Sequence, residues 1–233
     1  MSDIQFRSDM TVELIDSSAS DLSVVRAARV STKTESKSAW GDEKLIEFLM
    51  KNRHGTPFEH NSFTMYVEAP IFVFREWQRH RIGISYNEQS GRYTEFKPVF
   101  YIPDEDRALI QQGKPGHYEF VAGTDDQIMG TVVGLSWTSG SAFGAYAALL
   151  EMGIAKEVAR MCLPVNTYSS MYVTWNARSI MNFLSLRTKR EDSKFPSFPQ
   201  REIEMCADQV EEIWSQGMPL TAAAFDKHGR VAP

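Results

Sequence analysis

An arginine-rich stretch between residues 75 and 93 holds the side chains best suited to chemistry. Its four arginines are Arg75, Arg79, Arg81 and Arg92, in a chain whose formal net charge is −5. Each guanidinium presents a planar fork of donors that suits phosphate or pyrophosphate oxygens. Ser85, Asn87 and Ser90 add neutral donors, and Gly91 lets the backbone come close to a ligand. This composition favours an anion site, and a solvated helix end with ordinary ion pairs is the alternative that it leaves open.

Other catalytic groups receive less support from the sequence. Ser90 has no neighbouring base, since the nearest histidine in sequence is His80, so we expect it to form hydrogen bonds rather than to act as a nucleophile. His54 and His60 do not have the spacing of a zinc site, and no metal is expected. Cys162 and Cys206 both follow the pattern of small core residues. Neither a Rossmann fingerprint nor a Walker loop is present.

Five blocks of the sequence resemble those of the flavin-dependent thymidylate synthases, in the order in which that family has them. The signature block is Arg79-His80-Arg81, followed by a spaced Ser90 and then Gly91-Arg92-Tyr93. The other blocks are residues 24–31, 56–60, 157–160 with 163–164, and 176–179 with 182–184. One such block could arise by chance, whereas five in order over nearly the whole chain are specific.

The resemblance implies an enzyme that methylates dUMP to dTMP. It would take its carbon from 5,10-methylenetetrahydrofolate, carry electrons on bound FAD, and use NADPH as the reductant. The resemblance also implies a homotetramer whose active sites are shared between subunits. In such an enzyme the flavin supplies the redox chemistry, while the protein binds, orients and polarises the reactants.

The resemblance also assigns roles to individual residues. The FAD-contacting positions are Thr56, Arg79, His80, Arg81, Glu88, Asn176, Ala177, Arg178 and Asn182. The dUMP positions are Glu76, Trp77, Gln78 and Arg79 from one subunit, Glu88, Gln89, Ser90, Gly91 and Arg92 from a neighbour, and Arg160 and Arg187. Arg187 matches the catalytic arginine that binds the uracil ring and favours loss of its N3 proton.

The guanidinium of Arg187 suits this role chemically. A guanidinium held against the uracil carbonyl and N3 stabilises negative charge in the ring, which makes C5 more nucleophilic. Arg178 and Asn182 share one face of a helix, but Arg187 follows Arg178 by nine residues and points to the opposite side if the helix continues. Arg187 therefore either follows a bend or serves a different site from Arg178.

Three positions depart from the family pattern. The segment between Arg81 and Ser90 is one residue longer than in a common form of the family signature. The extra residue affects how residues 82–85 align with that signature. Glu76 stands where a glutamine is common. Residues 188–200 form a long stretch rich in proline, so the resemblance does not cover the loop that follows Arg187.

The pattern of apolar and polar residues predicts the elements that position these side chains. Strands are expected at 10–14, 62–68 and 168–175, and the Phe-Pro pairs of 194–199 exclude regular structure there. Helices are expected at 20–29, 42–54, 71–80, 141–151, 154–162, 176–186 and 203–214. Residues 113–140 show little periodicity, which predicts a surface excursion.

These elements and the resemblance predict a mixed α+β fold in one domain, residues 1–233, with an antiparallel-type sheet and flanking helices. Hydrophobic residues make up 42% of the 233 positions, enough for a sizeable core. The acidic balance argues against a general nucleic-acid or membrane partner. Two cysteines without nearby partners, and no secretory signal, predict a cytoplasmic protein.

A second hypothesis is a binding module without chemistry. Its arginine cluster, with Trp77, Tyr86 and Tyr93, would hold RNA or a free nucleotide by phosphate contacts and stacking. The blocks around Thr56 and Asn176 favour the enzyme, since a single-patch binder would not require them.

Overall fold

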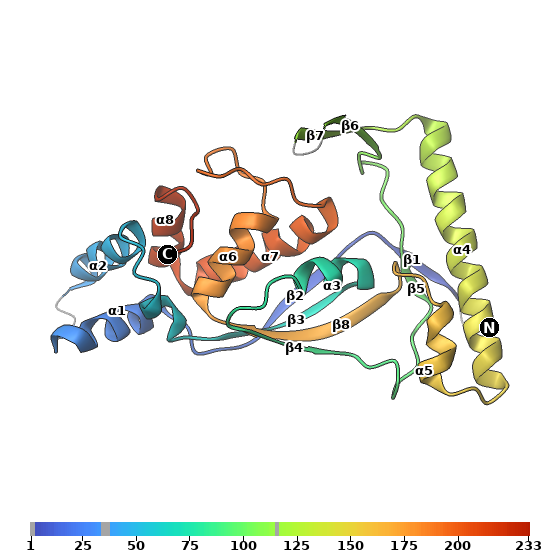
Figure 1. Cartoon of the computed structure of the whole chain (residues 1–233), viewed down its shortest axis with the longest axis horizontal. Coiled ribbons are helices and arrows are strands. Elements are labelled where there is room, and N and C mark those ends of the chain that lie inside the picture. The colour runs from blue at the N-terminus through green and yellow to red at the C-terminus, as the bar shows by residue number, and fades with distance from the viewer. Residues whose placement is uncertain (1–2, 34–37, 115–116) are drawn as a thin grey trace. The chain divides into compact units, whose positions relative to one another are not determined.

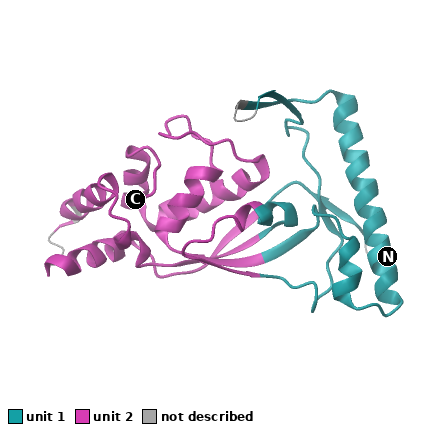
Figure 2. Cartoon of the chain, viewed as in Figure 1, with its two compact units in different colours: residues 1–10, 68–75, 88–170 teal, residues 11–67, 76–87, 171–233 magenta. Residues whose placement is uncertain are grey.

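The computed structural model describes residues 3–33, 38–114 and 117–233. The chain forms two compact units, each built from segments that are separate in the sequence (Figure 2). Unit 1 contains residues 1–10, 68–75 and 88–170, and unit 2 contains residues 11–67, 76–87 and 171–233. Strands β3, β4 and β8 and helix α3 each have residues in both units.

A four-stranded sheet has the strand order β2-β3-β8-β4. Its strands are β2 (Thr11–Ser17), β3 (Phe63–Pro70), β4 (Ile84–Glu88) and β8 (Tyr168–Trp175). Helix α3 (Ile71–Trp77) follows β3 directly, with Pro70 before its first residue. Buried and half-buried residues alternate along β3, which turns Phe63, Met65 and Val67 towards the core.

The helices of unit 2 cover this core. They are α1 (Asp21–Arg29), α2 (Ala39–Lys51), α6 (Ala177–Arg187), α7 (Arg201–Gly217) and α8 (Pro219–Lys227), with short 3-10 turns at Val30–Thr32 and Thr56–Glu59. Helix α7 packs against β2 and α6, while α1, α2 and α8 pack on one another (Figure 1). On α7, Cys206, Val210 and Trp214 recur at helical spacing and are fully buried, so this face supplies much of the core.

Unit 1 contains the longest helix. Its elements are β1 (Gln5–Arg7), β5 (Val99–Tyr101), β6 (Ile110–Lys114), β7 (His117–Val121), α4 (Asp125–Glu151), α5 (Lys156–Ala159) and a 3-10 turn at Arg160–Cys162. Strands β1 and β5 pair in parallel, and β6 and β7 form an antiparallel hairpin. Phe96, Tyr146 and Ala159 form a buried cluster under α4 and α5. No helix in the described ranges is long and apolar enough to cross a membrane.

Most of the expected elements are confirmed, including the mixed α/β class with an antiparallel-type sheet and flanking helices. Strand β8 has the predicted bounds, and Asn176 caps α6 by accepting a hydrogen bond from the Ser179 amide at 2.9 Å. Ser20 caps α1 as expected. Helix α2 begins three residues earlier than predicted, because Ser38 provides its cap. Helix α8 was not predicted.

The expectation of a surface excursion at 113–140 is wrong. Residues 110–114 and 117–121 form the antiparallel strands β6 and β7, and α4 begins at Asp125 and includes the helix expected only from residue 141. Thr124 and Gln127 form a reciprocal capping box at its start. Apolar side chains such as Met129 and Trp137 are exposed on α4, so no single apolar stripe marks the helix in the sequence. Periodicity therefore could not reveal it.

Candidate active site

Arg187, the last residue of α6, is the centre of a polar network in unit 2. Its Nε donates to His80 Nε2 at 3.0 Å, and its Nη2 donates to the Glu76 carbonyl at 3.2 Å. Its Nη1 pairs with the Glu76 carboxylate at 2.8 Å. The Arg187 side chain is only 17% exposed, so its charge is partly desolvated. The three contacts use three of the five guanidinium donors and leave one N–H on each Nη.

His80 is held in its neutral form. Burial, and secondly the nearby Arg187 charge, lower the pKa of His80 from 6.5 to about 4. A neutral imidazole whose Nε2 accepts from Arg187 carries its proton on Nδ1. At neutral pH, His80 therefore fixes the plane of the Arg187 guanidinium without adding charge.

Buried aromatic side chains pack against this network. Trp77 is fully buried and stacks on Phe183 of α6 with ring centroids 4.8 Å apart, and Trp175 lies 5.2 Å from the same ring. The Tyr86 hydroxyl donates to the carbonyls of Trp77 and His80, and burial raises its pKa. Trp77 therefore supports the network with its buried ring, and the substrate contact expected for this residue stays a prediction.

Arg178 forms a second cluster at the other end of α6. Its Nη1 pairs with the Glu59 carboxylate at 2.5 Å, and its Nε donates to the Pro233 carbonyl at 2.6 Å. Ala177 is buried, and its amide donates to the Asn61 side chain at 2.8 Å. Thr56 lies exposed in the 3-10 turn that also contains Glu59. The structure thus brings Thr56, Ala177 and Arg178 onto neighbouring elements, since α6 contacts this turn.

The two arginines of α6 serve different clusters. The helix is continuous from Ala177 to Arg187, so no bend separates them. Nine residues at about 100° each place them on opposite sides, as their separate partners show. The alternative of a bend is therefore wrong, and a different site for each arginine stays a prediction. Asn182 is exposed, and its side-chain amide donates to the Arg178 carbonyl at 3.1 Å.

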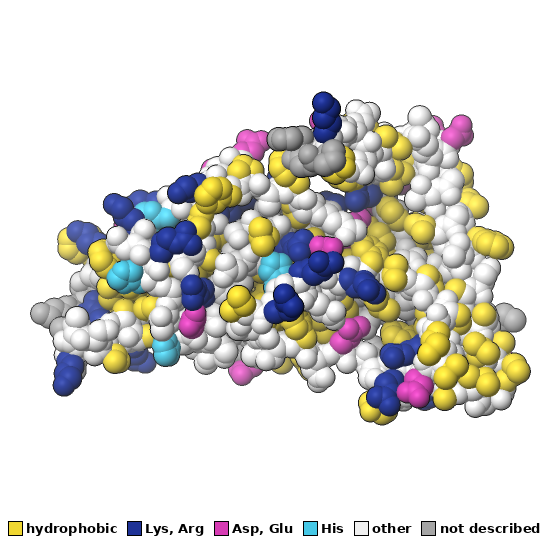
Figure 3. All heavy atoms as spheres, viewed as in Figure 1, with side chains coloured by type: hydrophobic (Ala, Val, Ile, Leu, Met, Phe, Trp, Pro, Cys, Tyr) yellow, Lys and Arg dark blue, Asp and Glu magenta, His cyan; other side chains and the backbone are white. Residues whose placement is uncertain are grey.

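The loop between α3 and β4 carries exposed cations. Gln78, Arg79 and Arg81 are exposed, and within the described ranges the two arginines form no ion pair. Figure 3 shows Lys and Arg side chains gathered with a His and an acidic side chain near α6. Ser179, buried in α6, donates to the Ile82 carbonyl at 2.8 Å and so ties the loop to the helix.

Gly83 allows this attachment. It has a φ of +68°, and a methyl group there would lie 2.6 Å from the Ser179 hydroxyl. The sequence assigned no role to Gly83, and it singled out Ser179 only as part of the family block 176–179.

A third cluster lies in unit 1, at the end of β4. The Glu88 carboxylate accepts a hydrogen bond from the Ser169 hydroxyl at 3.0 Å, and the Gln89 backbone N–H donates to the Ser170 carbonyl at 2.8 Å. Both contacts fix the start of the following turn on β8. Ser169 was not predicted, because its position on a strand of alternating residues has no motif of its own.

The turn after Glu88 presents the remaining nucleotide residues. The Ser90 carbonyl accepts from the amides of Tyr93 and Thr94, and its hydroxyl accepts from the Arg92 amide at 3.3 Å. Gly91 is buried, and a methyl group on it would lie 3.0 Å from Arg160 Cδ. This close approach brings the Ser90–Arg92 turn to Arg160.

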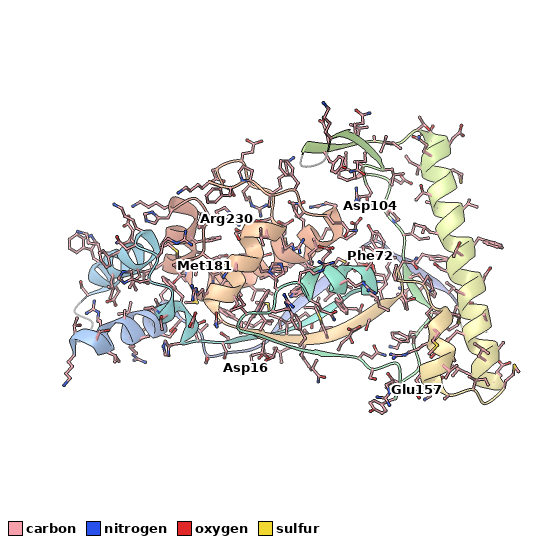
Figure 4. All side chains as sticks on the ribbon, viewed as in Figure 1. Asp16, Phe72, Asp104, Glu157, Met181 and Arg230 are labelled. Atoms are coloured by element: carbon pink, nitrogen blue, oxygen red, sulfur yellow. The ribbon has the colours of Figure 1, made fainter. Side chains whose placement is uncertain are left out.

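Arg92 is exposed and pairs with Glu157 of α5 at 2.9 Å (Figure 4 labels Glu157). The structure therefore unites Glu88 to Arg92 with Arg160 in unit 1, and Glu76 to Arg81 with Arg187 in unit 2.

The cysteines differ from one another. Cys206 is fully buried, as expected, and burial raises its pKa. Cys162 is exposed, so the expectation of a core position is wrong for it. It ends a 3-10 turn, where its thiol contacts the Ala159 carbonyl, and the apolar residues beside it face outward. Across the described part of the chain, no group of three or more His, Cys, Asp or Glu side chains could hold a metal ion.

Comparison with known proteins agrees with this arrangement. Residues 13–220 match the model of the family described as thymidylate synthase complementing protein. A flavin-dependent thymidylate synthase from Streptomyces coelicolor is 55% identical over 99% of this chain and 96% of its own. One from Tropheryma whipplei strain TW08/27 is 57% identical over 98% of this chain and 97% of its own.

A solved structure also has the same fold over nearly the whole chain. It is the UMP/dUMP methylase PolB from Streptomyces cacaoi bound with 5-Br UMP, and it superimposes with a TM-score of 0.93 at 53% identity over 99% of both chains. The same methylase bound with 5-Br dUMP gives a TM-score of 0.93. The matched residues contain all three clusters except the contact made by Pro233. This chain belongs to the family of flavin-dependent thymidylate synthases.

Proposed function

We propose that the protein methylates dUMP to dTMP, with 5,10-methylenetetrahydrofolate as carbon donor and NADPH as reductant through bound FAD. The observation that carries this proposal is the Arg187 network, which lies in a chain that belongs to this family. A binding module without chemistry is not favoured, because the relatives over nearly the full length are named as enzymes.

Arg187 supplies the catalytic polarisation in this proposal. His80 and Glu76 engage three of its N–H groups and leave one on each Nη. Two parallel donors on one planar group match the uracil carbonyl and N3, so they stabilise the anion formed when the N3 proton leaves. In this proposal Glu76 binds and orients the Arg187 guanidinium. A glutamine at this position would instead offer a neutral amide contact to the nucleotide.

The nucleotide phosphate is bound by the exposed cations and by the Ser90–Arg92 turn. Arg79 in unit 2 and Arg92 and Arg160 in unit 1 supply guanidinium donors, while Ser90 adds a hydroxyl. Charge-assisted hydrogen bonds from several arginines are the strong way to hold a phosphate. We propose that Glu76 to Arg79 of one subunit and Glu88 to Arg92 of a neighbour complete each site.

The polar groups of unit 2, together with Glu88 of unit 1, also fit FAD. Arg79 and Arg81 are exposed cations for a pyrophosphate, while Arg178 retains N–H groups beyond those bound to Glu59 and Pro233. His80, Glu88, Asn176 and Asn182 complete the proposed set with Thr56 and Ala177. When bound, the flavin would supply the electrons that convert the transferred carbon to a methyl group.

We propose that the assembly is a homotetramer in the cytoplasm. Exposed apolar side chains on α4 and around α5 support association, among them Trp137 at 74% and Met161 at 78% exposure. Figure 3 shows hydrophobic side chains over this part of unit 1. A contiguous apolar surface of this kind marks an interface. Light scattering of the active protein tests the assembly, and an active monomer would contradict shared sites.

The proposed function is tested by a visible spectrum followed by NADPH oxidation with and without dUMP. We expect flavin absorbance near 450 nm, a property of the cofactor. We also expect dTMP to form only when dUMP and 5,10-methylenetetrahydrofolate are both present. UMP is run beside dUMP, because the PolB structures contain analogues of both. A colourless protein that binds nucleotide without turnover would support the binding module instead.

A further inference from the structure

The last five residues, 229–233, pack against the cluster around Arg178. We name them the terminal segment. The match to the family model ends at residue 220, so this segment lies beyond it. Ala232 and Pro233 are buried nonetheless. The Ala232 carbonyl accepts from Arg53 Nη2 at 3.2 Å, and the Pro233 carbonyl accepts from Arg178 Nε at 2.6 Å.

Two acceptors fix the Arg178 guanidinium. Glu59 binds Nη1 and partly neutralises the charge, and the Pro233 oxygen binds Nε. Acceptors on Nε and Nη1 define the plane of the group, since a guanidinium is rigid and planar. Both N–H groups of Nη2 are left without a partner in the described ranges, and they lie in that fixed plane.

The backbone at Gly55 is adapted to this contact. A methyl group at Gly55 would lie 2.6 Å from Arg178 Cζ and 2.8 Å from the Pro233 carbonyl oxygen. Any side chain at this position would therefore separate Arg178 from the terminal segment or displace both. Thr56, one of the proposed FAD residues, follows Gly55 directly.

Arg230 anchors the terminal segment in unit 2. Its side chain is 3% exposed and pairs with Asp226 and, at 2.6 Å, with Glu211 of α7. Its Nη2 donates to Thr188 Oγ1 at 3.1 Å, directly after Arg187. Arg230 has a φ of +57°, a conformation that non-glycine residues adopt only when surrounding contacts hold it. Figure 4 labels Arg230 at the end of α8.

We infer that the terminal segment is a positioning element for Arg178, which it holds with its Nη2 donors ready for FAD. This inference rests on the proposed function, because the role of Arg178 toward FAD belongs to that proposal. The alternative is a segment that only covers the core, which would contribute to folding and not to the orientation of Arg178.

A double-mutant cycle measured on FAD affinity distinguishes a positioning role of the terminal segment from a role in covering the core. The variants are a deletion of residues 232–233, Arg178→Ala, and the two combined, each measured for FAD Kd by flavin fluorescence and for thermal midpoint. We expect the deletion to raise the FAD Kd about tenfold in the native background and less than about twofold in the Arg178→Ala background, because the Pro233 contact acts through Arg178. An equal factor in both backgrounds, or no change in either, would overturn the inference.

Further variants keep the test decisive. Gly55→Ala presses a methyl group on Arg178 as well as on Pro233, so it is the positive control for a displaced guanidinium. Deletion of Pro233 alone replaces the longer deletion in the cycle if that variant fails to fold. Lys227→Ala removes the ion pair to Glu47 at the end of α8 and touches none of the partners of Arg178, so its FAD Kd should be unchanged. Flavin-free wild-type protein would overturn the proposed function and this inference with it. An unchanged FAD Kd in the Arg178→Ala single variant would overturn the assignment of Arg178 to FAD and the positioning role of the terminal segment. The proposed function would stand.

Discussion

Replacing Arg187 by lysine keeps the charge and removes the planar fork. Arg187 has contacts to His80 and to two acceptors of Glu76, and it keeps two further N–H groups for the uracil ring. A lysine ammonium is a point donor that cannot satisfy His80 and Glu76 and still present two parallel donors. The variant therefore loses its paired hydrogen bonds to the ring while Arg79, Arg81 and Arg178 remain.

The size of the loss follows from those two hydrogen bonds. A hydrogen bond to a charged group contributes roughly 1.5–3 kcal/mol, so two contribute roughly 3–6 kcal/mol. At about 1.4 kcal/mol per factor of ten, turnover should fall about 10²–10⁴-fold. Bound flavin should be retained, since among the described residues His80 is the only proposed FAD residue that contacts Arg187, while the Arg178 cluster lies at the other end of α6.

The assay is dTMP formation in a single turnover at saturating dUMP, with bound flavin measured by absorbance. Arg201→Lys is the matched control, because Arg201 is half-exposed on α7 and pairs there with Glu204 and Asp208. It should change turnover by no more than about twofold. A folded, flavin-replete Arg187→Lys protein with turnover within tenfold of wild type would refute the role given to the fork.

Three further predictions concern His80, the cysteines and Ser90. The pKa of His80 is about 4 in the folded chain against 6.5 in the unfolded one, so its contribution to stability is complete above pH 6.5 and is lost as the pH falls towards 4. After allowance for solvent screening this amounts to about 1–2 kcal/mol, and urea unfolding from pH 7 to 4 should show it in wild type and not in His80→Gln. Cys162→Ala with Cys206→Ala should still make dTMP, at a stability cost of about 1–2 kcal/mol from the buried Cys206, as calorimetry and product assays would show. A folded, flavin-replete double variant without product would indicate a protein nucleophile. Ser90→Ala should weaken dUMP binding by about tenfold with turnover retained, since its hydroxyl accepts from the Arg92 amide and has no base beside it in the described structure; complete loss of product at saturating dUMP would contradict this.

Local chemistry in the sequence determined the elements that carry the site. Asn176 has the side chain that caps a helix, and the alternation before it predicts the strand, so β8 and α6 were expected close to their observed bounds. The spacing of Cys206, Val210 and Trp214 likewise predicted α7. These signals act over a few residues, so they can be read before the chain is folded. The residues of the proposed sites came instead from the resemblance to the family.

The tertiary structure decided how those residues are used. His80 and Arg187 are 107 positions apart, and no local pattern states that one accepts a hydrogen bond from the other. The sequence left open whether α6 bends and did not indicate that Pro233 reaches Arg178, and its prediction of a core position for Cys162 was wrong. The first part of α4, residues 125–140, escaped prediction because its exposed apolar residues form no single stripe. Partners outside a helix, not its own periodicity, determine which of its faces become buried. Contacts between distant segments depend on the packing of the whole chain. That packing places the Arg187 guanidinium against His80 and Glu76.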